Sequence, residues 1–218
     1  MKLKKILVMT IIILFAASGC KKTTEIQPLQ EEKKAEETAY DKIQKILSEM
    51  QTYTTSATVS YISNKGTNVY DTIQHVRMSG EYRIEVVAPE NAKGNVTFSD
   101  GTTITQYNKN IEGRVSVNIT ENMERSELFL SNFLRNYNNS QQVSVSVANL
   151  NEGECTILEA TIPKNHPYIS TQKLWISNET LEPVRMTIYD GNGSERIIID
   201  YSNFEYNTQL PDNLFKME

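Results

Sequence analysis

Hydrophobic residues recur with a helical period near the start of the folded region. The repeat consists of Ile43, Ile46, Leu47 and Met50. These positions are spaced i, i+3, i+4 and i+7, which is typical of a helix with one apolar face. Thr38, with Asp41 three residues later, matches a capping box, so we expect the helix to begin there.

A second helical repeat lies in the middle of the chain, over about residues 123–137. Its apolar positions are Leu130, Phe133, Leu134 and Tyr137. We expect Asn138 and Asn139 to end this helix, because asparagine tolerates the left-handed conformation that closes many helices.

Elsewhere the period is two, as in half-buried strands. The expected strands begin at Tyr53 and continue over 67–78, 82–88, 95–98, 102–107, 114–119, 143–147, 155–162, 173–177, 184–189 and 196–206. Turn signals separate neighbouring strands, among them residues 64–66, 99–101 and 190–193. An antiparallel sheet of about ten strands must curl. We therefore predict an α+β fold over residues 38–218: a curved, half-open β-barrel with two helices covering its concave face.

The N-terminus has the layout of a bacterial lipoprotein signal. Three lysines precede an apolar run of twelve residues, Ile6 to Ala17. That run is too short to span a bilayer core, which needs about 20 residues. The following residues, 17–20, read Ala-Ser-Gly-Cys and resemble the lipobox. We expect a signal peptide over 1–19 and a diacylated Cys20 at the mature N-terminus, anchored in a membrane outside the cytoplasm.

Residues 20–37 are polar and charged and are expected to form a tether. Without residues 1–20 the chain keeps 19 of its 22 Lys and Arg and all 27 Asp and Glu, a net charge of −8. Such an acidic chain is a poor candidate for binding nucleic acid.

The sequence offers little catalytic chemistry. Cys155 is the only cysteine besides Cys20, so no intrachain disulfide forms, and a small buried hydrophobe is its simplest role. His75 and His166 are the only histidines and lack zinc-site spacing. No G-x-S-x-G or phosphate-binding loop is present. We expect a protein that is not an enzyme and needs no cofactor or metal. A pair of catalytic carboxylates among the 27 acids stays open.

Several strand motifs resemble the LolA/LolB-like lipoprotein carriers. Residues 82–85 read Tyr-Arg-Ile-Glu before Pro89, and residues 96–101 read Val-Thr-Phe-Ser-Asp-Gly. The best match is C-terminal, where Leu-Trp-Ile at 174–176 is followed by Leu-Glu-Pro-Val at 181–184. The resemblance covers about residues 40–218. Within this superfamily the chain looks most like the clostridial spore germination lipoproteins.

That resemblance implies a non-enzymatic spore-envelope protein that binds and activates a zinc-dependent cell-wall N-acetylmuramoyl-L-alanine amidase. It marks no interface residues. A carrier or sensor of lipid or lipoprotein is the alternative, and an envelope-stress sensor is a third. Because open sheets have exposed edges, a homodimer formed by strand exchange also stays open. Arg83, Phe98 and Trp175 are candidate lining residues of an apolar cavity; core packing is the competing interpretation for the two aromatic residues.

Overall fold

The computed structural model describes residues 37–119, 128–151, 153–166 and 168–216. The helices are α1 (Ala39–Glu49) and α2 (Leu130–Asn139), with short 3-10 turns η1 (Lys109–Ile111) and η3 (Asp212–Phe215). The strands are β1 (Thr52–Ser63), β2 (Gly66–Arg77), β3 (Glu81–Ala88), β4 (Val96–Asp100), β5 (Thr103–Asn108), β6 (Gly113–Asn118), β7 (Val143–Leu150), β8 (Gly153–His166), β9 (Ile169–Ser177), β10 (Pro183–Tyr189) and β11 (Glu195–Tyr206).

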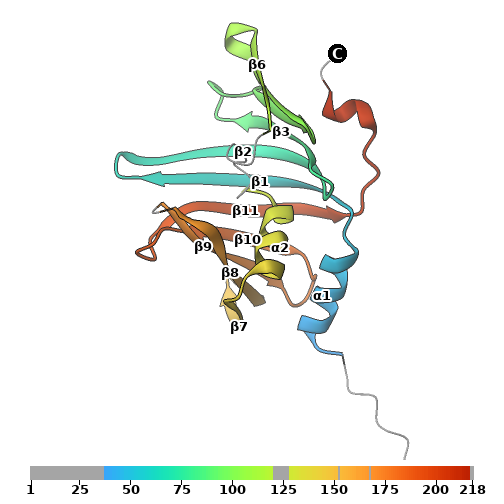
Figure 1. The fold of residues 1–218 in the computed structure, drawn as a ribbon, viewed down its shortest axis with the longest axis vertical. Coiled ribbons are helices and arrows are strands. Elements are labelled where there is room, and N and C mark those ends of the chain that lie inside the picture. The colour runs from blue at the N-terminus through green and yellow to red at the C-terminus, as the bar shows by residue number, and fades with distance from the viewer. Residues whose placement is uncertain (1–36, 120–127, 152, 167, 217–218) are drawn as a thin grey trace, which may run out of the picture. The chain divides into compact units, whose positions relative to one another are not determined.

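All eleven strands form one antiparallel sheet in the order β6-β5-β4-β3-β2-β1-β11-β10-β9-β8-β7 (Figure 1). Two meanders, β1–β6 and β7–β11, are joined in the middle, where the first strand pairs with the last. The outermost strands, β6 and β7, have no partner on their free sides among the described residues, so the sheet stays open. The predicted fold class is confirmed, with eleven strands in place of about ten.

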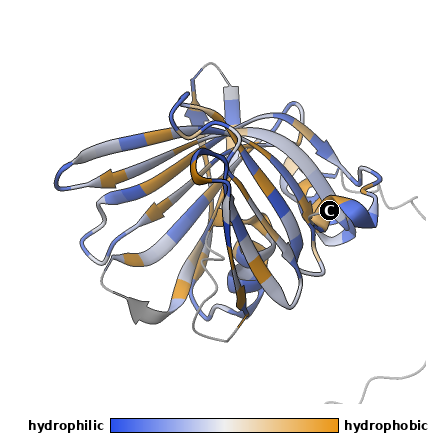
Figure 2. Ribbon diagram, turned by 90° about the horizontal axis from the view of Figure 1, so that it is seen from above, coloured by the Kyte–Doolittle hydropathy of each residue, from blue (hydrophilic) through white to orange (hydrophobic). Residues whose placement is uncertain are grey.

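Side chains alternate between two faces of the sheet. Figure 2 shows hydrophobic and hydrophilic residues alternating along the strands. In β1 the odd-numbered residues from Tyr53 to Val59 are buried and the even-numbered ones are half-buried. Because antiparallel partners share a face, the register extends this division across the sheet. We call the side that carries the buried row of β1 the helix face.

Both helices pack on the helix face. One core includes Ile43 and Leu47 of α1, Leu130 and Phe133 of α2, and residues of β1, β2 and β8–β11. α1 begins as expected. The Asp41 amide donates to Thr38 Oγ1 at 3.2 Å, and the Thr38 amide donates to Asp41 Oδ2 at 3.0 Å. This capping box satisfies backbone donors that the first helical turn leaves free.

The second helix differs from its expected bounds. Its predicted start lies within residues 120–127, outside the described residues, and the helix described here starts at Leu130. The helix ends at Asn139, as expected, but Asn138 and Asn139 are both helical, so the left-handed conformation expected of them was wrong. Ser140 caps the helix in an extended conformation, and Asn139 Nδ2 donates to the Arg135 carbonyl one turn earlier. That side-chain bond lets asparagine remain within the last turn.

The hairpin between β10 and β11 is built around a buried aspartate. Asp190 is 3% exposed, and its Oδ1 accepts from the amides of Asn192 and Ser194 at 2.9 and 3.0 Å. Its Oδ2 accepts from Arg196 Nε at 2.8 Å. These amide donors, first that of Ser194, together with Arg196 hold the pKa of Asp190 below its usual value of 3.8.

This carboxylate makes the stability of the domain sensitive to acid. Because the folded-state pKa of Asp190 is depressed, its contribution is complete above the unfolded value near 3.8 and is lost as pH falls through the folded pKa. We expect Asp190→Asn to lower the free energy of unfolding at pH 7. The difference in this free energy between the variant and the unmodified protein should become smaller below pH 4. Urea unfolding of both proteins between pH 3 and 7 measures this gap in free energy. Asp71→Asn, an exposed aspartate in β2, is the control; a gap independent of pH would contradict the role given to the Asp190 charge.

The opposite face of the sheet is covered in part by the C-terminal segment. Phe215 in η3 is 2% exposed and lies beside β3 and β4. Arg77 holds the segment in place: its Nη2 donates to the Leu210 carbonyl and to Asp212 Oδ1, both at 2.6 Å. The Arg77 guanidinium carbon also lies 4.7 Å from the centroid of the Phe215 ring. The segment Leu210–Phe215 thus makes a second, smaller core on the face of the sheet opposite the helices.

Candidate binding site

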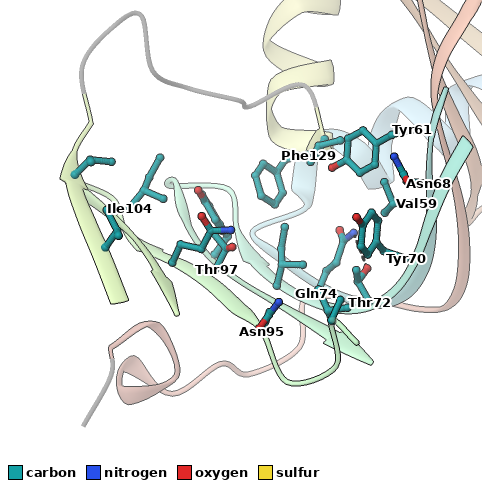
Figure 3. A pocket seen from close by; sticks show the side chains of 18 residues that line it. Val59, Tyr61, Asn68, Tyr70, Thr72, Gln74, Asn95, Thr97, Ile104 and Phe129 are labelled. Carbon is teal, nitrogen blue, oxygen red and sulfur yellow. Dashed lines mark hydrogen bonds between the residues drawn. The ribbon is translucent and has the colours of Figure 1, made fainter. Parts of the chain in front are cut away.

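The helix face is hollowed over the first meander. The hollow has a volume of about 850 Å³, within the range of small-ligand pockets. Its floor comes from β1–β6 and its upper wall from the residues before α2 (Figure 3). The lining residues are Val59, Tyr61, Asn68, Tyr70, Thr72, Gln74, Tyr82, Ile84, Val86, Ala92, Asn95, Thr97, Ile104, Gln106, Val115, Val117, Leu128 and Phe129.

None of these eighteen lining residues carries a charged side chain. Nine are aliphatic residues or phenylalanine, three are tyrosines, and six are Asn, Gln or Thr, in a chain of which 22% is charged. A charged group held against these described residues would lose its hydration without gaining a counter-charge from them. The described part of the wall therefore suits neutral groups.

Aromatic rings form the part of the hollow next to α2. The rings of Tyr82 and Phe129 have centroids 4.3 Å apart, which connects β3 to the residue that precedes α2. Tyr61 and Tyr70, on paired strands, meet edge to face with centroids 6.1 Å apart. Such ring pairs add stability beyond the area they bury. The wall is thus a structured surface, and the Tyr82–Phe129 contact depends on the placement of α2.

One polar group of the hollow is both buried and unpartnered. Gln74 is 1% exposed, and its Nε2 donates to Thr72 Oγ1 at 3.3 Å. The Thr72 hydroxyl donates its own proton to the Ala57 carbonyl at 3.0 Å. Thr72 Oγ1 must therefore accept from Gln74, which fixes the orientation of the amide. Gln74 Oε1 is left with no hydrogen-bond partner among the described residues (Figure 3).

The three candidate lining residues from the sequence lie elsewhere. Arg83 pairs with Phe98 across β3 and β4, and their neighbours Ile84 and Thr97 line the hollow. Since neighbours in a strand point to opposite faces, Arg83 and Phe98 lie on the face away from the hollow. Trp175 likewise pairs with Ile157, while Leu174 and Leu158 belong to the helix-face core. Arg83 forms an ion pair with Glu85 at 3.6 Å, and Phe98 is 7% exposed.

The residues that line the hollow, among them Thr72, Gln74 and Phe129, were not identified from the sequence. Thr72 and Gln74 alternate with Val76, so all three share a face with the buried row of β1. Two polar residues that alternate with a valine along one strand could have been identified from the sequence, because polar side chains on a buried face need hydrogen-bond partners. No sequence pattern indicated that Phe129 lines the hollow, since its position depends on where α2 lies.

The groups with catalytic potential are shielded. Cys155 is a free thiol, 2% exposed, and burial raises its pKa, which keeps it protonated and weakly nucleophilic. Burial, followed by the nearby Arg83 guanidinium, lowers the pKa of His75, so its imidazole is neutral at pH 7. The side chain of His166 lies outside what the structure describes. Among the described residues, no three His, Cys, Asp or Glu side chains gather in a way that could hold a metal ion.

The open edges of the sheet are now located. At one end, β7 presents Val143, Val145 and Val147, which are 46%, 44% and 58% exposed. At the other, β6 presents Val115, which is 67% exposed. Exposed edges with apolar residues favour pairing with another chain. A homodimer built on such an edge stays a prediction.

The membrane-anchor prediction falls on residues outside the description, Cys20 included. Within the described part of the chain, neither helix has the length and hydrophobicity to cross a membrane.

Three solved structures are similar to this chain, and the first of them supports the fold. An uncharacterized conserved protein from Thermus thermophilus matches with a TM-score of 0.53 and 12% identity, over 83% of this chain and 94% of that one. A LolA superfamily protein from Nitrosomonas europaea matches with a TM-score of 0.43 and 11% identity, over 83% and 98%. The GerS lipoprotein of Clostridioides difficile, solved in complex with the CwlD amidase, matches with a TM-score of 0.48 and 28% identity, over 82% and 100%.

No curated protein matches the sequence. A family model does, and its match spans nearly the whole chain, residues 2–215. The family is described as sporulation protein YdcC-like. Because this match covers nearly the whole chain, it shows that the chain belongs to the YdcC-like sporulation proteins.

Proposed function

We propose that this chain is a membrane-anchored, non-catalytic lipoprotein that binds and activates a cell-wall amidase during spore formation, and that it is needed for germination. The observation that carries the proposal is the match to a sporulation family over residues 2–215. The sequence resemblance to GerS, at 28% identity, indicates the kind of partner, since GerS forms a complex with the CwlD amidase.

The chemistry of the described residues is compatible with a binding role. The buried thiol of Cys155 and the neutral, half-buried imidazole of His75 lie in separate strands, β8 and β2, and no group of three possible metal ligands is found among the described residues. The hollow, whose described lining is uncharged, and two open edges offer surfaces for contact. Lipidation at Cys20 would hold these surfaces near the outer face of a membrane, in the spore envelope.

The test is an amidase assay with purified proteins from the organism that carries this gene. We expect the sporulation amidase to hydrolyse cell-wall fragments slowly alone and at least about tenfold faster with the full chain, an increase within the usual range of coupling between binding sites. Spores lacking the gene should then carry unmodified cortex and fail to germinate. An amidase that is equally active without the chain would contradict the proposal.

A second candidate is a carrier or sensor of lipid or lipoprotein. The hollow of about 850 Å³ on the helix face is the observation that favours it. It differs from the first candidate in placing function in the hollow rather than on a surface that the amidase contacts.

A further inference from the structure

We propose that the free edge of β7 pairs with the same edge of a second copy of this chain, with the two strands antiparallel and Val145 of one copy opposite Val145 of the other. This inference does not depend on the amidase proposal. It rests on three features of β7: the open backbone of the edge, the absence of charge along it, and a residue pattern that matches itself when the second copy is turned around.

The free edge of β7 is long and regular. The strand pairs with β8 from Val143 to Leu150 without a register shift, and on its other side it has no partner among the described residues (Figure 1). Seven of its eight residues are exposed. Alternate residues of β7 direct their N–H and C=O groups away from β8, so a further strand can form hydrogen bonds there.

The sequence of β7 lacks the residues that usually protect an edge. It reads Val-Ser-Val-Ser-Val-Ala-Asn-Leu, without a charged side chain, a proline or a glycine. Natural sheets protect their edges with lysine, proline, a bulge or a short strand. The opposite edge, β6, has only six residues and includes Gly113 and Arg114. Of the two edges, β7 is therefore the one open to pairing.

The charge beside β7 is compensated within the same copy. On the face of the sheet opposite the helices, the Ser144 hydroxyl donates to Glu159 Oε2 at 3.2 Å, and Lys173 Nζ lies 3.2 Å from the same oxygen. The whole chain has 27 acidic and 22 basic residues, so two copies repel each other in most orientations. An uncharged edge is a surface where they can meet without that repulsion.

The residue pattern of β7 selects a second copy as the partner strand. Because Val145 pairs with Leu158 of the helix-face core, the three alternate valines form an exposed row on the helix face. With Val145 opposite itself, Val143 lies opposite Val147 of the second copy. Every valine then faces a valine, and β-branched pairs of this kind stabilise a sheet.

Other registers lose this match. A shift of one residue places the valines of one copy opposite the serines of the other, and a shift of two places Val143 opposite Asn149. Of these registers, only the one centred on Val145 pairs all three valines of each copy with valines.

Cysteine cross-linking of the full chain in detergent tests the register. Val145→Cys is expected to form a disulfide between two copies, because opposite residues of antiparallel strands lie within disulfide distance. A mixture of Val143→Cys and Val147→Cys chains should also cross-link. Val143→Cys by itself is the matched control and should not, since its two copies would lie about 14 Å apart. Electrophoresis without reductant after mild oxidation measures the cross-linked fraction.

Val145→Lys tests whether this edge holds the two copies together. Sedimentation velocity of the full chain over a range of concentrations gives the dissociation constant of the dimer. We expect Val145→Lys to raise this constant about tenfold, because two lysines then lie opposite each other in place of a valine pair. Val115→Lys, on β6 at a position 67% exposed, is the matched control and should change the constant by no more than about twofold.

Three outcomes would overturn the proposal. The first is an unmodified chain that stays monomeric at every concentration, which would leave the edge free, covered by another part of the same chain, or reserved for a different protein. The second is cross-linking of Val143→Cys by itself to the extent seen for Val145→Cys. The third is a dimer that Val115→Lys weakens as much as Val145→Lys does. Amidase activation that survives in Val145→Lys would leave the function proposed above intact, so the two proposals can fail separately.

Discussion

Phe133→Ala is expected to lower the free energy of unfolding by about 3–5 kcal/mol, the usual cost of removing a fully buried phenylalanine. Phe133 is 0% exposed and lies in the core that joins α2 to the sheet. Its ring stacks near that of Tyr137 in the same helix, with centroids 5.9 Å apart. Since α2 has only ten residues and its N-cap residue makes no side-chain hydrogen bond, tertiary packing must hold it in place.

Urea unfolding followed by circular dichroism measures this loss. Asn138→Ala is the matched control, because Asn138 lies in the same helix but faces solvent. We expect that change to alter the free energy of unfolding by no more than about 0.5 kcal/mol. Equal losses in the two variants would mean that helix propensity, and not packing, holds α2.

Phe215→Ala is expected to cost nearly as much, about 3 kcal/mol, although the residue lies near the C-terminal end of the chain. Its ring is 2% exposed beside β3 and β4 and under the Arg77 guanidinium. In β4, Val96 and Phe98 are 8% and 7% exposed and would gain contact with water if the segment came away. The expected decrease in the free energy of unfolding therefore has two sources: the buried Phe215 ring is removed, and apolar residues of the second core become exposed to water.

Thermal unfolding of Phe215→Ala beside Lys216→Ala tests this second core. Lys216 follows Phe215 directly but is exposed, so its truncation should change the free energy of unfolding by no more than about 0.5 kcal/mol. A stable Phe215→Ala variant would show that the C-terminal segment lies on the sheet without stabilising it.

The sequence predicted the start of α1, the strands and the hairpin turns, because interactions between residues close together in the chain determine these features. Thr38 and Asp41 specify the start of α1 through bonds to each other, so this short stretch of sequence was enough. The strands followed from alternation, and the glycines and asparagines between them marked the hairpins. Asn139 shows the limit: its left-handed tendency was overridden by a bond to the Arg135 carbonyl within the same helix.

The candidate site depends on which face of each strand is covered and by which segment. These contacts join residues that are far apart in the sequence, so local patterns do not predict them. Phe98 looked like a cavity or core residue because it is large and apolar. It is buried, but under a segment that includes Phe215, which is far away in the chain. Alternation alone could not reveal that the face of β4 opposite the hollow is covered by η3. Gln74 was identifiable in principle, since it is in phase with buried Val76, but its significance required the bond to Thr72.

The pairing of the first strand with the last also sets the order of events during folding. Tyr53 lies opposite Tyr206, so the centre of the sheet stays incomplete until the strand that contains Tyr206 has been synthesised. Before that point each meander can form only by itself, with a β1 or β11 edge ready to pair with a neighbouring chain. Closure over about 150 residues makes this the step with the highest contact order in the domain. A nascent chain held apart from other copies would be protected from mispairing until β11 can pair with β1.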